Sequence, residues 1–168
     1  PDNVGTLVFR NLLAGGFKGE LYAINPKHER VQGKPCYPDI EHIGKAVDLA
    51  VIATPAQTVP DIIRQCGEAG VRVAVILSAG FGESGDAGVL LEKEILEHAR
   101  LYDMRIVGPN CLGILRPQSG LNASFSNSNV LPGRMAFVSQ SGALCTAILD
   151  WAQSSAIGFS AIVSLGDA

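Results

Sequence analysis

The sequence contains no unbroken apolar run that approaches the roughly 18 residues needed for a membrane-spanning helix. It also has few charges: 17% of its 168 residues are Asp, Glu, Lys or Arg, and the formal net charge is −3. The lysines and arginines are scattered, so the basic patch of a nucleic-acid-binding protein is missing. These absences direct the search for a partner toward a small molecule or another protein.

Cysteine is also scarce, with 4 in the chain. The cysteines form no CxxC pair and have no histidine at metal-ligand spacing, so the sequence predicts neither a zinc site nor a disulfide scaffold. We therefore expect no bound metal and a reducing, cytoplasmic location. Because no charged segment followed by an apolar core opens the sequence, we expect no signal peptide. The cysteines are Cys36, Cys66, Cys111 and Cys145.

Glycine and apolar residues, by contrast, are abundant. The chain has 19 Gly and 47% hydrophobic residues, a composition typical of α/β proteins with tight strand-to-helix turns. Continuous apolar runs predict parallel strands buried on both faces, and helical patterns between them indicate right-handed βαβ units. The expected strands span Leu21–Asn25, Val47–Thr54, Val71–Ala79 and Met104–Val107, and the expected helices span Thr6–Leu13, Ala56–Ala69 and Asp86–Tyr102.

A second pattern begins after a segment rich in Ser, Asn, Gly and Pro. We expect that segment, residues 116–133, to be a linker that follows a Rossmann-like domain formed by residues 1–115. Residues 134–168 then predict one further βαβ unit, the truncated start of a second domain. Its strands are expected at Met135–Ser139 and Phe159–Leu165, with a helix at Ala143–Gln153.

The expected alternation of strands and helices lacks a strand at its start. Asp2–Thr6 reads as the end of a glycine-bearing turn that opens a helix, yet no strand precedes it. In a doubly wound sheet that strand is central. We therefore expect these residues to come from a longer protein whose first strand lies outside the sequence.

A basic corner follows the first expected strand, at Asn25-Pro26-Lys27. Dinucleotide-binding folds normally carry Asp or Glu at this point, where the carboxylate holds a ribose 2′-hydroxyl. A lysine ammonium instead attracts phosphate. The corner therefore favours coenzyme A or NADP over NAD.

Small residues occupy three other turns. Thr54-Pro55-Ala56 and Ser78-Ala79-Gly80 end successive strands, at the edge where open α/β sheets bind ligands. Ser139-Gln140-Ser141-Gly142 opens a helix whose N–H groups suit an anion, although simple capping by Ser141 is the alternative. With the basic corner, these turns predict a crevice shaped for a nucleotide.

The sequence contains no complete catalytic set. His28, His42 and His98 lie in polar segments away from any candidate nucleophile, so we expect solvated surface roles for them. Cys111 is a conceivable nucleophile, but packing at a strand end is the favoured interpretation. We therefore predict no catalytic residue within this chain.

Five motifs occur in a fixed order along the chain: Asn25-Pro26-Lys27, Ser78-Ala79-Gly80-Phe81, Gly108-Pro109-Asn110-Cys111-Leu112-Gly113, Leu121-Asn122-Ala123-Ser124-Phe125 and Ser139-Gln140-Ser141-Gly142. Together they resemble the NDP-forming acyl-CoA synthetases, the superfamily of the succinyl-CoA synthetase α subunit and ADP-forming acetyl-CoA synthetase. The resemblance covers nearly the whole chain. It implies a CoA-binding Rossmann-like domain followed by the start of a flavodoxin-like ligase domain.

The resemblance also implies site residues. Those that match or border the family's CoA site, near its phosphates or along its loops, are Gly5, Lys27, Pro55, Ser78, Ala79, Gly80 and Asn110. Ser141 and Gly142 match the helix N-terminus that receives phosphate during the family's reaction.

In that reaction, acyl-CoA and phosphate give an acyl phosphate, a histidine takes the phosphoryl group, and an ATP-grasp domain or β subunit passes it to NDP. The resemblance thus implies CoA or acetyl-CoA, ATP or ADP with Mg on the ATP-grasp module, a small carboxylic acid, and an oligomer. The phosphorylated histidine lies outside these residues. Thr146 stands where the succinate enzymes carry tyrosine, which favours a smaller acyl group such as acetyl.

Two alternatives stay open. Ile148–Gln153 and Gly158-Phe159-Ser160 are similar to the synthetase-like region of bacterial protein lysine acetyltransferases. In that interpretation the chain senses acetyl-CoA and a GNAT domain follows it. The other alternative is an NAD(P)-binding Rossmann domain. Gly142, retained in the phosphate turn, favours a working ligase.

Overall fold

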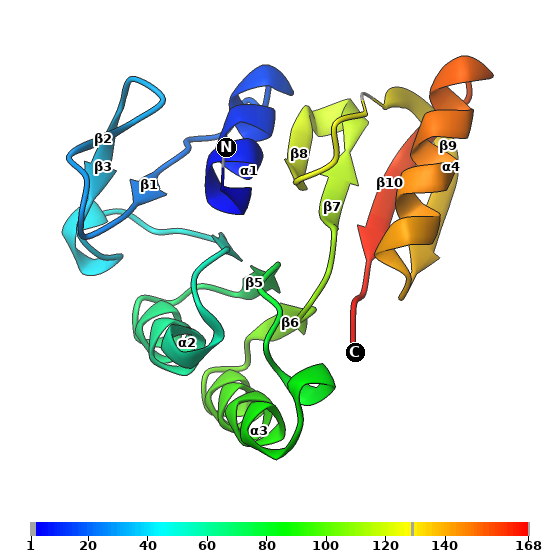
Figure 1. Cartoon of the computed structure of the whole chain (residues 1–168). Helices are drawn as coiled ribbons and strands as arrows, with labels where there is room; N and C mark the ends of the chain where they lie inside the picture. Colours follow the sequence, from blue (N-terminus) through cyan, green and yellow to red (C-terminus); the bar gives the residue numbers. More distant parts are fainter. Residues whose placement is uncertain (1–2, 129, 168) are drawn as a thin grey trace.

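The computed structural model describes residues 3–128 and 130–167. Figure 1 shows its two halves, one built around strands β4, β5 and β6 and the other around β7 to β10. Within the described ranges, none of the helices has the length and apolar character that crossing a membrane requires.

The first half contains a parallel sheet with strand order β4-β5-β6. Its strands are β4 (Leu49–Ile52), β5 (Val73–Ile76) and β6 (Arg105–Val107). This confirms the expected α/β fold, although the paired residues of β4 and β5 end two and three residues before the predicted apolar runs do. The last residues of these two runs belong to loops at the carboxyl edge of the sheet.

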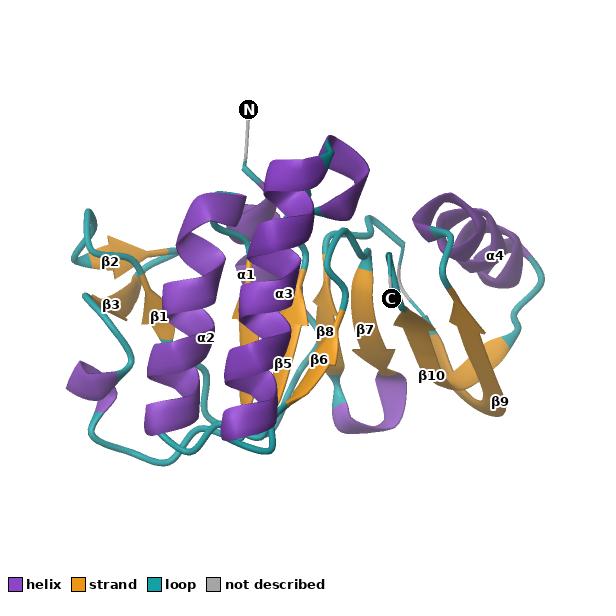
Figure 2. Cartoon of the chain, turned by 90° about the horizontal axis from the view of Figure 1, so that it is seen from below, coloured by secondary structure: helices purple, strands orange, loops and turns teal. Residues whose placement is uncertain are grey.

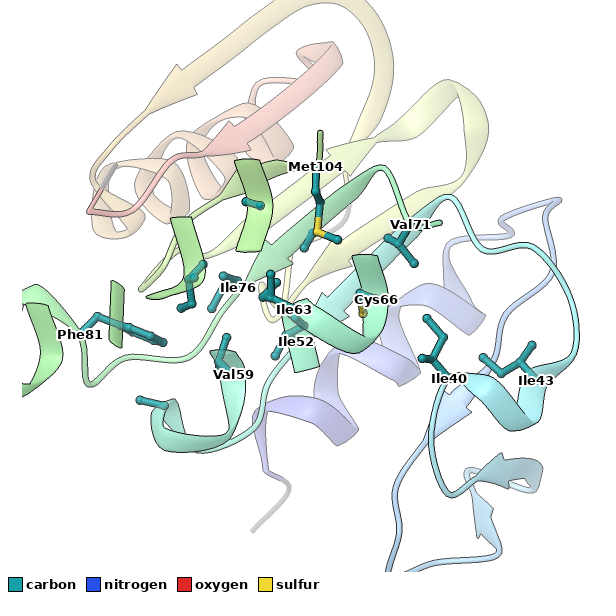
Figure 3. Close-up of a cluster of buried hydrophobic side chains, with 14 residues drawn as sticks. Ile40, Ile43, Ile52, Val59, Ile63, Cys66, Val71, Ile76, Phe81 and Met104 are labelled. Atoms are coloured by element: carbon teal, nitrogen blue, oxygen red, sulfur yellow. The ribbon is translucent and has the colours of Figure 1, made fainter. Parts of the chain in front are cut away.

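Helices cover both faces of this sheet. Figure 2 shows α2 (Val59–Glu68) and α3 (Asp86–Leu101) on the near face, with α1 (Val4–Ala14) behind the strands. On the near face Ile63 and Ile95 pack with Ile76, as the close-up in Figure 3 shows for the surrounding cluster. On the far face Val8 packs with Val75. Burial on both faces explains why these strands have no polar alternation.

A small separate sheet carries the basic corner. Its strands are β1 (Ala23–Ile24), β2 (Arg30–Val31) and β3 (Lys34–Tyr37), in the order β1-β3-β2. The expected strand at 21–25 is thus only two residues long, and it pairs with β3 rather than with β4. Strand β3 was not predicted because its sequence, Lys-Pro-Cys-Tyr, is short, and its first two residues are exposed.

The second half is a four-stranded mixed sheet with the order β8-β7-β10-β9. Strand β10 (Gly158–Ser164) runs parallel to β9 (Leu131–Ser139) and antiparallel to β7 (Gly113–Arg116), while α4 (Gly142–Ser154) connects β9 to β10. The predicted βαβ unit is therefore present. Strand β8 (Leu121–Ser124) and the start of β9 lie in the segment predicted to be a linker. The domain limits themselves, at residues 115 and 134, stay a prediction.

The Asn11 side chain connects the first half to the second. The Asn11 amide Nδ2 on α1 donates hydrogen bonds to the backbone oxygens of Ser124 and Ser126, each at 2.8 Å. Both serines are buried, at 0% and 5% exposure. Asn11 therefore satisfies two carbonyl groups that have little access to water.

Replacing Asn11 with alanine is expected to lower the free energy of unfolding by about 1–3 kcal/mol, because two carbonyls lose their donor in a buried setting. Urea unfolding followed by circular dichroism measures the change. Lys93→Ala, on the exposed face of α3, is the control and should stay within about 0.5 kcal/mol of the parent. Equal stability of the Asn11 variant and the control would contradict this role for Asn11.

Candidate functional site

The carboxyl ends of β4, β5 and β6 are joined to one another by hydrogen bonds. The Ser78 hydroxyl Oγ donates to the backbone oxygen of Thr54 at 2.5 Å. The backbone N–H of Asn110 donates to the backbone oxygen of Ser78 at 2.9 Å. The turns that contain Pro55, Ser78 and Asn110 therefore form one continuous edge, as expected for parallel strands.

The beginning of α1 lies beside this edge. The Asn3 side chain caps the helix by accepting the Thr6 N–H at 2.8 Å. A Cβ placed on Gly5 would lie 3.8 Å from the Cβ of Ala53, which follows β4. The structure therefore brings Gly5 to the same edge as Pro55. The N–H groups of the first turn of α1, which have no partner within the helix, lie in this region as well.

The loop after β5 depends on glycine and on an acidic side chain. Gly80 has φ +106, a backbone conformation that residues with a Cβ rarely adopt. The Glu83 carboxylate accepts hydrogen bonds from the N–H of Gly80 and from the N–H of Phe81, the latter at 3.1 Å. Ser78, Ala79 and Gly80 were predicted from the sequence, whereas Glu83 was not.

The pKa of Glu83 reflects these contacts. Its partial burial raises the pKa of the carboxyl group, but the backbone N–H donors of Gly80, Glu83 and Phe81 outweigh that effect and hold it below the ordinary glutamate value. A side-chain interaction with Asp167 acts in the same direction. Glu83 is therefore a carboxylate at neutral pH.

The Asn110 turn is held from the second half of the molecule. The Asn110 amide Nδ2 donates to Asp167 Oδ2 at 3.0 Å, and the Asp167 N–H donates to the Pro109 oxygen at 3.1 Å. A Cβ on Gly166, which has φ +66, would come within 2.0 Å of the Pro109 oxygen. The segment that follows β10 is thus packed directly on the turn. Asp167 has no motif around it that sequence reasoning could have used.

Helix α4 begins close to the same turn. Ser141 is its N-cap, with the hydroxyl Oγ accepting the Leu144 N–H at 3.2 Å. Beside it lies a cleft of about 370 Å³. Asn110 lines this cleft from one side, and Gly142 lines it from the other together with Thr146. The structure therefore brings the Asn110 turn and the beginning of α4 into one space.

Lys27 lies elsewhere, in a second pocket of about 330 Å³ on the small sheet. The Lys27 N–H donates to Asn25 Oδ1 at 2.9 Å, and the Asn25 N–H donates to the Tyr37 oxygen at 2.9 Å. These bonds fix the backbone of the corner while the Lys27 side chain stays exposed. The basic corner and the cleft are consequently two separate depressions.

The residues considered as catalysts have unreactive surroundings. Cys111 is 2% exposed, and burial raises the pKa of its thiol to about 11, so it is a poor nucleophile at neutral pH. His42 is exposed and lies 2.6 Å from Asp39, which raises the pKa of the imidazole. His98 lies 4.0 Å from Glu94 on α3. Across residues 3–128 and 130–167, no three His, Cys, Asp or Glu side chains are grouped to hold a metal ion.

Comparison with known proteins gives two family matches. Residues 1–117 match a family described as CoA binding domain. Residues 132–168 match a family described as succinyl-CoA ligase like flavodoxin domain. Both matches agree with the arrangement of the two halves.

Several relatives have a longer chain. The chain is 45% identical over 164 residues to acetate–CoA ligase [ADP-forming] I of Archaeoglobus fulgidus, covering 98% of this chain and 24% of that protein. It is 41% identical to acetate–CoA ligase [ADP-forming] I subunit alpha of Pyrococcus furiosus, covering 99% and 37%. The structure matches that of the dinucleotide-forming acetyl-coenzyme A synthetase 1 of Candidatus Korarchaeum cryptofilum, in complex with phosphate and ADP, with a TM-score of 0.93 and 43% identity, covering 99% and 35%. The chain thus spans between about a quarter and two fifths of these relatives.

Proposed function

The chain belongs to the CoA-binding domain family over residues 1–117 and continues into a succinyl-CoA ligase-like flavodoxin domain, and from this membership we propose that it forms the CoA-binding part of an NDP-forming acyl-CoA ligase. The overall reaction interconverts acyl-CoA, NDP and phosphate with the free acid, CoA and NTP. Acetate is the proposed acid, since the relatives named above are acetate or acetyl-CoA enzymes.

The observation that carries the proposal is the cleft of about 370 Å³ between the Asn110 turn and the beginning of α4. A ligase of this class has to bring the thiol end of CoA to a phosphate-bearing acyl group. The carboxyl edge of a parallel sheet suits CoA, and the N-terminus of a helix suits the phosphate of the acyl group. In this fold the two features line the same space.

When bound, CoA supplies the thiol that carries the acyl group. The Ser78–Gly80 loop, Pro55 and Asn110 border the edge where we propose that the pantetheine part lies, with Gly5 at the start of α1 beside them. Small side chains there leave the backbone accessible to a long, thin ligand. The exposed ammonium of Lys27 attracts the phosphates of CoA at the far corner.

Ser141 and Gly142 are proposed to receive phosphate. The first N–H groups of α4 have no partner within the helix, and the helix dipole adds partial positive charge at this end. A Cβ on Gly142 would meet nothing closer than Leu112 Cβ at 3.8 Å, so glycine leaves open space beside these N–H groups. The wall of the cleft formed by Thr146 fits a small acyl group such as acetyl.

The remaining parts of the reaction are proposed to lie outside this chain. They are the phosphorylated histidine and an ATP-grasp domain or β subunit, which binds ATP or ADP with Mg, in an oligomeric enzyme. One relative is named as a subunit alpha, which fits a partner subunit for this part of the enzyme. A cytoplasmic location fits the four free cysteines of the chain.

Calorimetric titration of the full-length protein with CoA tests the proposal. CoA is expected to bind with a dissociation constant in the micromolar range, and NADH is expected not to compete with it. ADP formation from ATP should require acetate and CoA together. Tight NADH binding without CoA binding would instead support a dinucleotide-binding domain, and CoA binding with no ligase activity would favour an acetyl-CoA-sensing role.

A further inference from the structure

Glu83 binds the loop that precedes it at two adjacent backbone positions. One carboxylate oxygen accepts the N–H of Gly80, and the other accepts the N–H of Phe81 at 3.1 Å. Hydrogen bonds to an ionised acceptor are about twice as strong as bonds between neutral groups. Glu83 therefore supplies two strong contacts to a segment that has no regular secondary structure.

The loop is anchored at its two ends by other residues. At the start, the Ser78 hydroxyl donates to Thr54, and the Ser78 oxygen accepts the N–H of Asn110. At the end, Phe81 is 0% exposed and belongs to the main core. Between these anchors lie Ala79 and Gly80, and the contact from Glu83 fixes the position of the Gly80 N–H.

Glu83 itself has a defined position. It lies in a 3-10 turn, Gly82–Ser84, that is closed by the Ser84 N–H donating to the Phe81 oxygen at 2.8 Å. The carboxylate bonds to residues only two and three positions earlier in the chain, so the closed ring is short and costs little entropy to form. An incoming ligand is therefore a weak competitor for these N–H groups.

We propose that Glu83 is a positioning residue of the CoA site, which holds Ala79 and Gly80 in the shape that receives CoA and keeps the N–H groups of Gly80 and Phe81 out of direct phosphate binding. The inference rests on the CoA-binding function proposed above. It adds a residue to that site and assigns it an indirect role, exerted through the loop.

The test measures CoA affinity of the full-length protein by calorimetry. Glu83→Ala is expected to weaken CoA binding about tenfold, since the backbone of roughly one residue has to be ordered again on binding. Glu83→Asp, one methylene shorter, should weaken it by a similar factor. Glu83→Gln keeps one acceptor oxygen for one of the two N–H groups, but its NH2 group faces the other, so it should recover only part of the affinity that Glu83→Ala loses.

Glu97→Ala is the matched control, because Glu97 is an exposed carboxylate on α3 that pairs only loosely with Lys93, at 3.9 Å. It should leave the CoA dissociation constant unchanged. Melting temperatures of all variants are measured alongside, and Glu83→Asp carries the test if Glu83→Ala does not fold.

Three outcomes would overturn the inference. Unchanged affinity in Glu83→Ala and Glu83→Asp would remove Glu83 from the site while leaving the proposed function intact. Tighter CoA binding by these variants would mean that Glu83 competes with the ligand instead of positioning the loop. A parent protein that does not bind CoA would overturn the proposed function together with this role.

Discussion

Replacing Gly88 with alanine is expected to lower the free energy of unfolding by about 3 kcal/mol, the upper range for an overpacked core. A Cβ at this buried position would lie 1.7 Å from the backbone oxygen of Phe81 and 2.3 Å from its carbonyl carbon. Because the obstacle is backbone, no side-chain rotation relieves the clash. Either the first turn of α3 or the loop that ends at Phe81 has to move.

The intrinsic preference of helices for alanine over glycine opposes this effect, but only by about 1 kcal/mol. Chemical denaturation measures the net change. Gly5→Ala is the matched stability control, because its Cβ would meet Asn3 Oδ1 at 3.6 Å and Ala53 Cβ at 3.8 Å, which are ordinary contacts. A Gly88→Ala protein at least as stable as the parent would show that α3 can shift without cost.

Reversing the charge of Lys27, by replacement with glutamate, is expected to weaken CoA binding about 100-fold or more. The substitution removes a charge-assisted contact of about 1.5–3 kcal/mol and adds repulsion of about 1 kcal/mol for an exposed pair of like charges. The corner backbone should keep its shape, since the Asn25 side chain accepts the N–H of residue 27 whichever side chain that residue carries.

Calorimetry at two salt concentrations separates an electrostatic effect from a change in the shape of the corner. The loss of CoA affinity should be smaller at high salt, because salt screens the repulsion. Lys93→Glu, on the exposed face of α3, is the control for the change in net charge. Dephospho-CoA, which lacks the 3′-phosphate, tests which phosphate is involved. Equal affinity of the parent and the Lys27→Glu protein would exclude Lys27 from the CoA site.

The buried strands could be predicted because burial on both faces requires an apolar side chain at every position, and this is visible in the sequence itself. Strands β4 and β5 are covered on both faces, so each residue is apolar, and continuous runs identify them. Strand β8 lies in Leu121-Asn122-Ala123-Ser124, which reads as polar. Its place in the sheet depends on pairing with its neighbour β7 and on contacts with α1, and α1 lies more than one hundred residues earlier in the sequence.

The candidate site likewise contains some residues that local sequence could predict and others that it could not. Small residues at turns predicted Ser78 and Gly142, because that chemistry is local, while Asn110 was predicted from the family resemblance. Glu83 and Asp167 act through hydrogen bonds whose geometry exists only after folding. Nothing in the residue types could show that Lys27 occupies a pocket separate from the cleft, since that depends on how the small sheet lies beside the larger one.

The position of β7 between β8 and β10 determines where this polypeptide can be divided. Its hydrogen bonds join it to β8, which follows directly, and to β10, which lies more than forty residues later. A gene split at residue 115 would cut through β7 and give two products with unpaired strand edges, which are prone to aggregate. Across this junction, a single uninterrupted reading frame is therefore a requirement for correct assembly.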